Sequence, residues 1–247
     1  QKIVHIPHLL YYWRSSPTSV ASGIEAKTYC IEAAIKALYA HYARLGVAVD
    51  ELSMIPDTPG FYKTDYTIQR PGLVSILIPS CDHAKDLRTC VDSIYAKTTY
   101  PHFEIIVIEN NSKEEETFRT YERLERQHPD SFRVVRWEGT GFNYSALNNF
   151  GARFAQGEYL LLLTNDTEVI TPRWLGENVM FAQQERIGCV GAKLLYPDDT
   201  IQHAGLGFGH LSLAAHMHKN FPVANPGYMG RLVYAHDVYG VTGACLM

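Results

Sequence analysis

The sequence predicts an α/β protein with a mostly parallel sheet, helices on both faces of that sheet, and a helical extension before it. From Leu73 onward, short apolar runs alternate with segments of helical period, which is the pattern of successive βαβ units. Four consecutive leucines follow Tyr159, as expected for a parallel strand that is buried on both faces. Prolines and glycines crowd residues 56–72 and separate the extension from the main domain.

Length and composition are those of a globular protein. The chain has 247 residues, of which 46% are hydrophobic, and a formal net charge of −4, so nucleic acid is not expected as its main partner. The five cysteines form no C-x-x-C pair, which indicates reduced thiols in the cytoplasm. No apolar run reaches the ~18–20 residues of a membrane span, and no signal peptide is visible. Both ends look cut, and we expect a segment of a longer protein.

Residues 1–72 are expected to form the extension and a linker. Apolar side chains recur at spacings of three and four between Ile31 and Leu45, which predicts a helix over about residues 19–45. Residues 47–72 show no sustained period and are expected to contain one short strand. Residues 73–247 would then be the main domain.

The main domain is expected to alternate strands and helices. Thr171 followed by Pro172 has the pattern of a helix cap and a first helical residue, and Ser112 fits as the cap of a charged helix. The expected strands are 74–78, 104–108, 132–137, 158–163 and 188–196, and the expected helices are 84–97, 113–128, 143–156 and 171–184.

Polar residues follow three of these strands, in the segments 79–82, 109–112 and 164–166. Because the carboxyl ends of parallel strands meet at one edge of a sheet, we expect the three segments to line a common cleft. The amide of Asn110 offers both a donor and an acceptor to a base or a ribose. The carboxylate of Asp166 suits Mg²⁺ or Mn²⁺, and a simple turn-capping role is the alternative for it.

The histidines near the end of the chain match no metal motif. His203, His216 and His218 lack the H-E-x-x-H spacing, so we expect surface or substrate-contacting side chains rather than a dedicated metal site. The glycines at 205, 207 and 209 lack the strand and helix that flank a dinucleotide fingerprint, and no P-loop or G-x-S-x-G motif is present.

Taken in order, several stretches resemble family 2 of the glycosyltransferases. The resemblance runs through residues 74–79, 90–94, 100–112, 143–149 and 155–166, and it rests on order and spacing rather than on one motif. Residues 191–197 and 201–205 are similar to the bacterial branch that builds rhamnose-containing or O-antigen-type polysaccharides. Residues 8–20 look like the tail of a preceding transferase domain in the same protein.

The resemblance implies a GT-A fold, which is Rossmann-like. It also implies transfer of a sugar from a UDP- or dTDP-linked donor to a hydroxyl of a glycan or lipid-linked acceptor, with inversion and with help from Mg²⁺ or Mn²⁺. The setting would be bacterial surface polysaccharide synthesis in the cytoplasm, which includes the inner face of the membrane.

The family motifs also imply roles for particular residues. Asp166 is the expected metal ligand, and His203 and Gly243 are candidates for contact with the acceptor or the donor sugar. The expected donor-binding residues are Pro79, Cys81, Asp82, Glu109, Asn110, Asn143, Asn149 and Asn165.

Two departures from the family pattern affect these expectations. Thr164 and Asn165 stand where the family usually has further acids, so a metal held by Asp166 should bind weakly without the donor. The family's general base is expected in a segment after Met247, so no catalytic residue is assigned and this segment would be inactive alone.

Two other functions compete with transfer. A non-catalytic module that binds a nucleotide sugar or a glycan within a polysaccharide-assembly complex would explain the thinned acidic motif. A nucleotidyltransferase would need a glycine-rich phosphate loop after the first strand, and residues 80–83 do not supply one.

Overall fold

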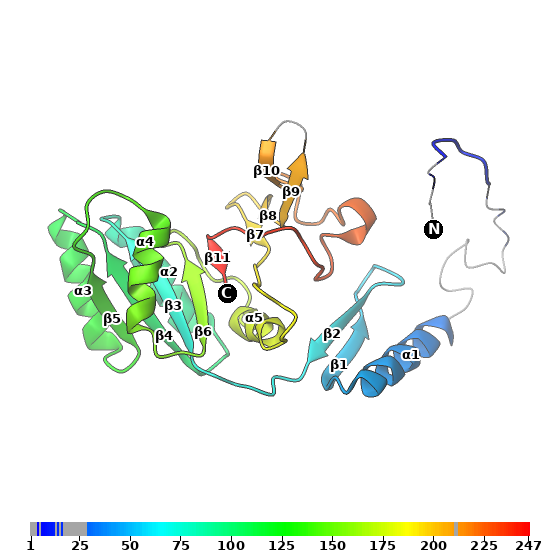
Figure 1. Cartoon of the computed structure of the whole chain (residues 1–247), viewed down its shortest axis with the longest axis horizontal. Helices are drawn as coiled ribbons and strands as arrows, with labels where there is room; N and C mark the ends of the chain where they lie inside the picture. The colour runs from blue at the N-terminus through cyan, green and yellow to red at the C-terminus, as the bar shows by residue number, and fades with distance from the viewer. Residues whose placement is uncertain (1–3, 5, 13, 15, 17–28, 210–211) are drawn as a thin grey trace. The chain divides into compact units, whose positions relative to one another are not determined.

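The computed structural model describes residues 4, 6–12, 14, 16, 29–209 and 212–247 (Figure 1). The chain divides into two compact units, Gln1–Tyr66 and Thr67–Met247. The first unit contains helix α1 (Tyr29–Leu45) and an antiparallel hairpin of β1 (Val49–Met54) and β2 (Tyr62–Tyr66). The helix expected at 19–45 is confirmed from Tyr29 onward, and its earlier part lies outside the described residues.

The β1–β2 hairpin corrects the expectation of a linker with one short strand. Its two strands are short and mostly half-buried, so neither shows a clear alternation of apolar and polar residues. Tyrosines of α1 hold it in place, because the Tyr39 hydroxyl accepts the Leu52 N–H and the Tyr42 hydroxyl bonds to Thr64. The hairpin therefore depends on its helix, a partner that local sequence does not reveal.

The second unit is built on one five-stranded sheet with the order β11-β6-β3-β4-β5. Four strands run parallel, and β11 (Cys245–Leu246) runs antiparallel to β6 at one edge. The parallel strands are β3 (Val74–Ser80), β4 (Phe103–Glu109), β5 (Phe132–Arg136) and β6 (Tyr159–Leu163). The predicted α/β class with a mostly parallel sheet is confirmed.

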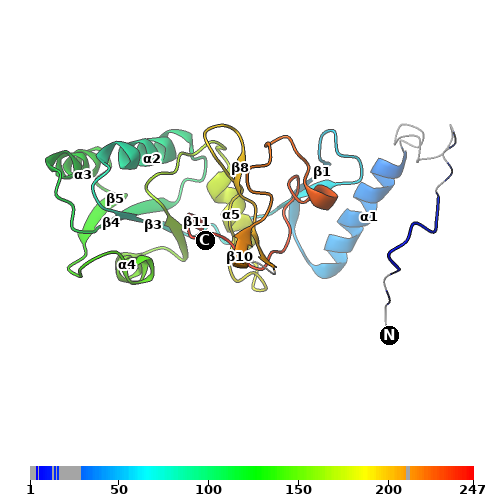
Figure 2. The same cartoon turned by 90° about the horizontal axis from the view of Figure 1, so that it is seen from above.

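Helices cover both faces of this sheet, as Figure 2 shows: α2 (Ala84–Lys97) and α3 (Glu115–Gln127) lie on one face and α4 (Tyr144–Gly151) on the other. Alternate residues of each strand enter separate cores. On the α2 and α3 face, Ile76 and Ile78 pack with Leu87 and Leu124. On the α4 face the fully buried core residues are Leu77, Ile106, Ile108 and Leu147. This double burial explains the near-continuous apolar runs of β3 and β4. The expectation that the leucines of β6 are buried on both faces is wrong in part, because Leu160 is 39% exposed.

A buried polar cluster closes the α4 face at the amino ends of the strands. The Glu104 carboxylate, in β4, accepts hydrogen bonds from the Ser75 hydroxyl at 2.6 Å, from an Arg133 guanidinium nitrogen, and from the Gln156 N–H. The Ser75 hydroxyl in turn accepts the Gly157 N–H at 2.9 Å. The cluster thus joins β3, β4 and β5 to the segment that leads into β6.

The second half of the unit departs from the expected elements. Helix α5 (Trp174–Ala182) begins after Arg173, so Thr171 and Pro172 do not cap it as predicted. The strand expected at 188–196 is reduced to β7 (Leu194–Leu195) and to an isolated antiparallel bridge between Gly191 and Leu246 of β11. Short antiparallel pairs follow, formed by β7 with β8 (Ile201–His203) and by β9 (Leu206–Gly209) with β10 (Ser212–His216). Two 3₁₀ turns, η3 (Ala152–Phe154) and η4 (Tyr228–Gly230), complete the elements among the described residues of this unit, and η3 replaces the end of the helix expected at 143–156.

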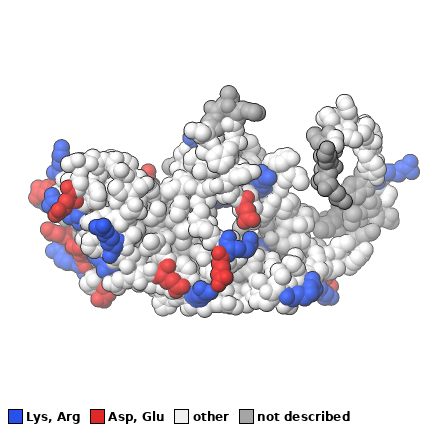
Figure 3. All heavy atoms as spheres, in the orientation of Figure 1, with Lys and Arg blue, Asp and Glu red and all other residues white. Residues whose placement is uncertain are grey.

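Charged side chains of both signs gather over α3, as Figure 3 shows. They include the i,i+4 pairs Glu115–Arg119 and Glu122–Arg126, which are exposed and add little stability. Among the described residues, no helix has the length and apolar character to span a membrane.

Gly157→Ala should destabilise this unit. A β-carbon here would lie 2.5 Å from the Leu73 carbonyl oxygen and 2.7 Å from the Ser75 amide nitrogen. These backbone atoms cannot rotate away, so we expect a loss of about 1–3 kcal/mol in the free energy of unfolding, measured with urea. Gly176→Ala is the matched control, because its β-carbon would meet only Tyr100, at 3.9 Å, and helix α5 would gain propensity. Equal effects of the two changes would contradict the packing argument.

Acid should also destabilise the fold through His203. This side chain is buried, and its Nε2 accepts the N–H groups of Gly205 and Thr242. Burial, aided by the nearby His216, lowers the pKa of His203 from 6.5 to about 4. The unfolded chain therefore takes up this proton before the folded chain does, so the stabilisation is complete above pH 6.5 and is lost as the pH falls from 6.5 towards 4.

The measurement is urea unfolding at pH 7.5 and pH 5. We expect the folded state to lose about 2 kcal/mol from this group between the two conditions. His203→Gln should remove that part of the pH dependence, whereas His83→Gln, at an exposed position, should leave it in place. An unchanged pH dependence in His203→Gln would show that another group is responsible.

Candidate functional site

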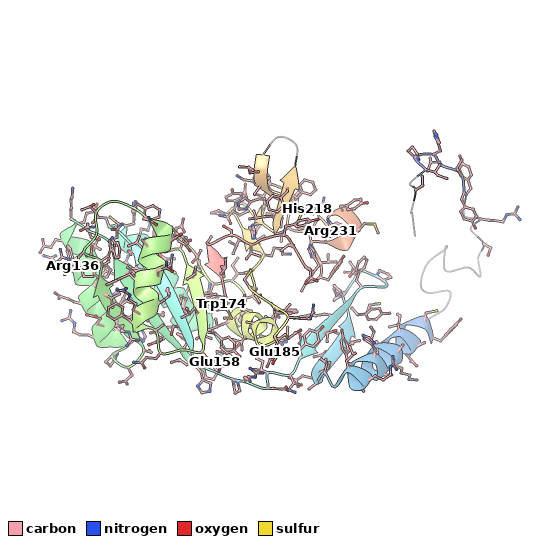
Figure 4. All side chains as sticks on the ribbon, in the orientation of Figure 1. Arg136, Glu158, Trp174, Glu185, His218 and Arg231 are labelled. Atoms are coloured by element: carbon pink, nitrogen blue, oxygen red, sulfur yellow. The ribbon has the colours of Figure 1, made fainter. Side chains whose placement is uncertain are left out.

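The carboxyl ends of β3, β4 and β6 meet at one edge of the sheet and enclose a pocket of about 190 Å³. Arg136, at the carboxyl end of β5, and Glu158, just before β6, mark opposite edges of the sheet in Figure 4. The structure brings four of the predicted donor-binding residues into the pocket wall: Pro79, Cys81, Asn110 and Asn165. Its other lining residues are Ser80, His83, Phe142 and Leu147.

Strand register explains why these residues meet. Ser80 pairs with Glu109 at the end of the β3–β4 ladder, and the Asn110 N–H continues it by donating to the Ser80 carbonyl. On the other side Leu77 pairs with Leu162, so β6 carries the chain to Asn165 beside the end of β3. The pocket is therefore a direct product of parallel pairing.

The Ser80 hydroxyl is the least satisfied polar group in the pocket wall. The residue is 3% exposed, and its Oγ has no hydrogen-bond partner within the described residues. The Tyr121 hydroxyl is also buried without a hydrogen-bond partner among the described residues; burial raises the pKa of Tyr121, and the Ser80 and Ser112 hydroxyls oppose that shift. A buried hydroxyl without a partner costs free energy, so it is a natural contact for a ligand.

Cys81 contributes a neutral thiol to the pocket. Partial burial raises its pKa, and the charges of Asp82 and Glu109 act in the same direction. The thiol therefore keeps its proton at neutral pH, and it suits packing against a ligand rather than nucleophilic attack.

Asp82 and Glu109 support the walls of the site. Asp82 Oδ1 accepts the N–H groups of Lys113 and Glu114 before α3, and these bonds lower the pKa of Asp82. Glu109 is buried, accepts the Ser112 N–H, and lies 3.7 Å from the Arg136 guanidinium. Both carboxylates thus have protein partners and lie outside the pocket lining.

The expected Ser112 cap is wrong. Helix α3 begins after Glu114 without a side-chain cap of its own, and the Ser112 hydroxyl accepts the Asp82 N–H instead. The capping carboxylate comes from Asp82, about thirty residues earlier in the chain. Asp82 and His83 both adopt left-handed backbone, at φ 55°, and the bonds made by Asp82 offset that strain beside the pocket.

The two asparagines expected near the diphosphate belong to α4. Asn143 is the N-cap of this helix, and its side chain accepts the Ala146 N–H. Asn149 is exposed on the helix, whereas its neighbour Asn148 is buried and donates to the Tyr144 carbonyl. Neither predicted asparagine lines the pocket.

Asp166 lies exposed in the turn after β6, directly after the pocket-lining Asn165. In the part of the chain that the structure describes, no three His, Cys, Asp or Glu side chains gather as a metal site. A single carboxylate beside an amide fits a magnesium-like cation that takes its other ligands from substrate phosphates and water. The donor set is compatible with a cation that binds together with a phosphorylated ligand.

His203 and Gly243 lie next to the same edge, but they are held by the protein. The His203 Nδ1 is 3.0 Å from the His216 Nδ1, and its Nε2 accepts two backbone N–H groups, so both ring nitrogens have partners. The Gly243 carbonyl accepts a hydrogen bond from the Tyr144 hydroxyl.

Sequence reasoning missed several residues that form the site. Ser80 stands between two predicted residues, and only its burial without a partner distinguishes it. Phe142 could have been found from the sequence, because it is an aromatic residue directly before the helix-capping Asn143. In the structure its side chain is 75% exposed. Leu147 reads as an ordinary core residue, and nothing in the sequence marks Tyr144 as a partner of Gly243.

Comparisons with known proteins identify relatives of this chain. The model of the family "Glycosyl transferase family 2" matches residues 75–233. Protein y4gI of Sinorhizobium fredii is 41% identical over 247 residues, which cover 100% of this chain and 27% of the relative. The O-antigen biosynthesis protein RfbC of Myxococcus xanthus is 37% identical over 248 residues, which cover 99% of this chain and 19% of the relative.

Among solved structures, the mannosyltransferase PcManGT of Pyrobaculum calidifontis, in complex with GDP-Man and Mn²⁺, matches with a TM-score of 0.47. It is 22% identical, and the match covers 71% of this chain and 48% of that one. This chain thus spans only about a quarter of y4gI and a fifth of RfbC. The family match extends over more than half of this chain, from the second residue of β3 to beyond η4. The chain belongs to glycosyl transferase family 2.

Proposed function

We propose that this chain is the donor-binding part of an enzyme that transfers a sugar from a nucleoside diphosphate to an acceptor hydroxyl in bacterial surface polysaccharide synthesis. Family membership and the similarity to RfbC support the reaction and its setting. The observation that carries the proposal is the pocket at the carboxyl edge, whose wall contains four residues expected to bind the donor.

The size of the pocket suits one part of such a donor. Its volume of about 190 Å³ is below the ~300–1,000 Å³ of sites that enclose a whole drug-sized ligand. The pocket would therefore take the base and ribose, and the diphosphate and sugar would lie along the open edge of the sheet. UDP- and dTDP-linked sugars are the proposed donors.

The lining residues divide the binding of the nucleoside between them. Pro79, Leu147 and Phe142 offer apolar surface to the rings, and the Cys81 thiol packs beside them. The Asn110 amide and the Ser80 hydroxyl offer hydrogen bonds to the base and ribose. Asn143 and Asn149, on the exposed side of α4, are proposed to face the diphosphate.

Asp166 is the proposed ligand of Mg²⁺ or Mn²⁺, next to Asn165. When bound, such an ion offsets the charge that develops on the departing diphosphate. The residues of this chain bind and orient the donor, and no described residue is proposed as the general base. Transfer itself is therefore proposed for the longer protein, with a glycan or a lipid-linked acceptor.

The much greater length of the relatives supports a further proposal about organisation. Residues 73–247 would form the transferase domain, and residues 1–72, which contain α1 and the β1–β2 hairpin, would be the tail of a neighbouring transferase domain, with a linker only after β2. Every pocket-lining residue belongs to the compact unit Thr67–Met247.

Asp166→Ala should abolish metal-dependent binding of the donor. At about ten times its Kd, a UDP- or dTDP-sugar with Mn²⁺ should raise the Tm of the wild-type chain by about 3–5 °C, measured by differential scanning fluorimetry. In Asp166→Ala the part of this shift that needs Mn²⁺ should disappear, because the carboxylate beside Asn165 is removed.

Asp130→Ala is the matched control, since it removes an exposed acid from the loop before β5, at the amino edge of the sheet. No shift of the wild-type chain with any nucleotide sugar would refute donor binding. Binding without transfer or hydrolysis in the full-length protein would instead favour a non-catalytic module.

Ser80→Ala should weaken nucleotide binding without destabilising the fold. The hydroxyl makes no hydrogen bond to a described residue, so its removal should cost little stability, but a ligand bond worth about a fivefold change in Kd is lost. Isothermal titration with the nucleoside diphosphate and urea unfolding measure the two effects. A loss of stability with unchanged affinity would show that the hydroxyl is structural.

A further inference from the structure

The carbonyl group of Gly243 is fixed by a tyrosine of helix α4. The Tyr144 hydroxyl, in the first turn of α4, donates a hydrogen bond to the carbonyl of Gly243, which lies 99 residues later in the chain. The contact is tight, because a β-carbon on Gly243 would lie 3.0 Å from the Tyr144 ring and its hydroxyl. Burial raises the pKa of Tyr144, so this hydroxyl keeps its proton and remains a donor.

The neighbouring peptide groups are held as well. The His203 Nε2 accepts the Thr242 N–H at 3.2 Å, and the Ala244 carbonyl accepts the Thr164 N–H at 3.1 Å. Three consecutive residues thus have fixed partners from β8, α4 and the end of β6. The Gly243 N–H makes no hydrogen bond within the described residues, although it lies in this well-held segment.

The strand order places this segment beside the nucleotide pocket. Asn110 follows β4, Cys81 follows β3 and Asn165 follows β6, so they form a row along the carboxyl edge. The next strand is β11, and its antiparallel direction brings the residues before Cys245 to the same edge. A nucleoside bound near β3 and β4 would extend its diphosphate past Asn165 and its sugar towards Gly243.

We propose that Tyr144 is a positioning residue for the donor sugar: its hydroxyl holds the Gly243 carbonyl while His203 holds the Thr242 N–H, and the peptide group between these two anchors presents the Gly243 N–H to a sugar hydroxyl. Glycine is needed here because a side chain would meet Tyr144 and cover the peptide. The inference rests on the proposed function and adds to it the group that recognises the sugar rather than the nucleoside.

The test compares the affinity for a nucleoside diphosphate with that for its sugar conjugate. Isothermal titration with Mn²⁺ would use the pairs UDP and UDP-glucose, dTDP and dTDP-glucose, and GDP and GDP-mannose. For the pair that binds, Tyr144→Phe should leave the Kd of the free diphosphate within about twofold and weaken the sugar conjugate about fivefold, the effect of one lost hydrogen bond. Gly243→Ala should show the same selective loss.

Tyr95→Phe is the matched control, because it removes a tyrosine hydroxyl that bonds to Ser131, just before β5 at the amino edge. This variant should change neither affinity. Equal weakening of both ligands by Tyr144→Phe, or no weakening of either, would overturn the role of Tyr144 while leaving the proposed function intact. A wild-type chain that binds none of the six ligands would refute both.

Discussion

The buried carboxylate of Glu104 is the interaction on which the sheet depends. A buried charge is tolerated only when it is paired and hydrogen-bonded, and this one has partners in Ser75, Arg133 and the Gln156 N–H. Those partners belong to β3, β5 and the entry to β6, so satisfying one carboxylate fixes the relative register of four strands. A shift of any strand by one residue would turn its partner to the opposite face and leave the charge unpaired.

Register fixed at the amino edge determines what meets at the carboxyl edge. The middle of each central strand is apolar, so the polar residues that can meet a ligand follow the strand ends, and the locked register brings Cys81, Asn110 and Asn165 to one pocket. The Asp82 carboxylate then ties the turn after β3 to the start of α3. The site thus has a rigid frame beneath short loops, which suits recognition of a ligand part as small as a nucleoside.

The sequence predicted that the site lies at the carboxyl edge of the sheet, because apolar runs that alternate with helical segments indicate parallel strands. Four residues that were predicted from the strand ends do line the pocket. It failed where a residue's role depends on a partner far along the chain. Ser112 has the composition of a helix cap, yet Asp82 takes that role because the β3 turn lies against α3. His203 looks like a substrate ligand by type, but its ring bonds the backbone at Thr242. Local propensity carries no information about such pairings.

The antiparallel strand β11 brings to the carboxyl edge residues that precede a strand, which parallel strands cannot do. Each parallel strand offers only the turn that follows it, and those turns are occupied by the pocket and by helix starts. β11 runs the other way, so the residues that precede it, Gly243 and Ala244, arrive at the carboxyl edge from the distant β7–β10 region. The β11 ladder is short and would hold these residues weakly. Hydrogen bonds from Tyr144 to the Gly243 carbonyl and from the Thr242 N–H to His203 restrain the segment further. The pocket side of this edge is therefore shaped by sheet register, and the segment before β11 by side-chain contacts.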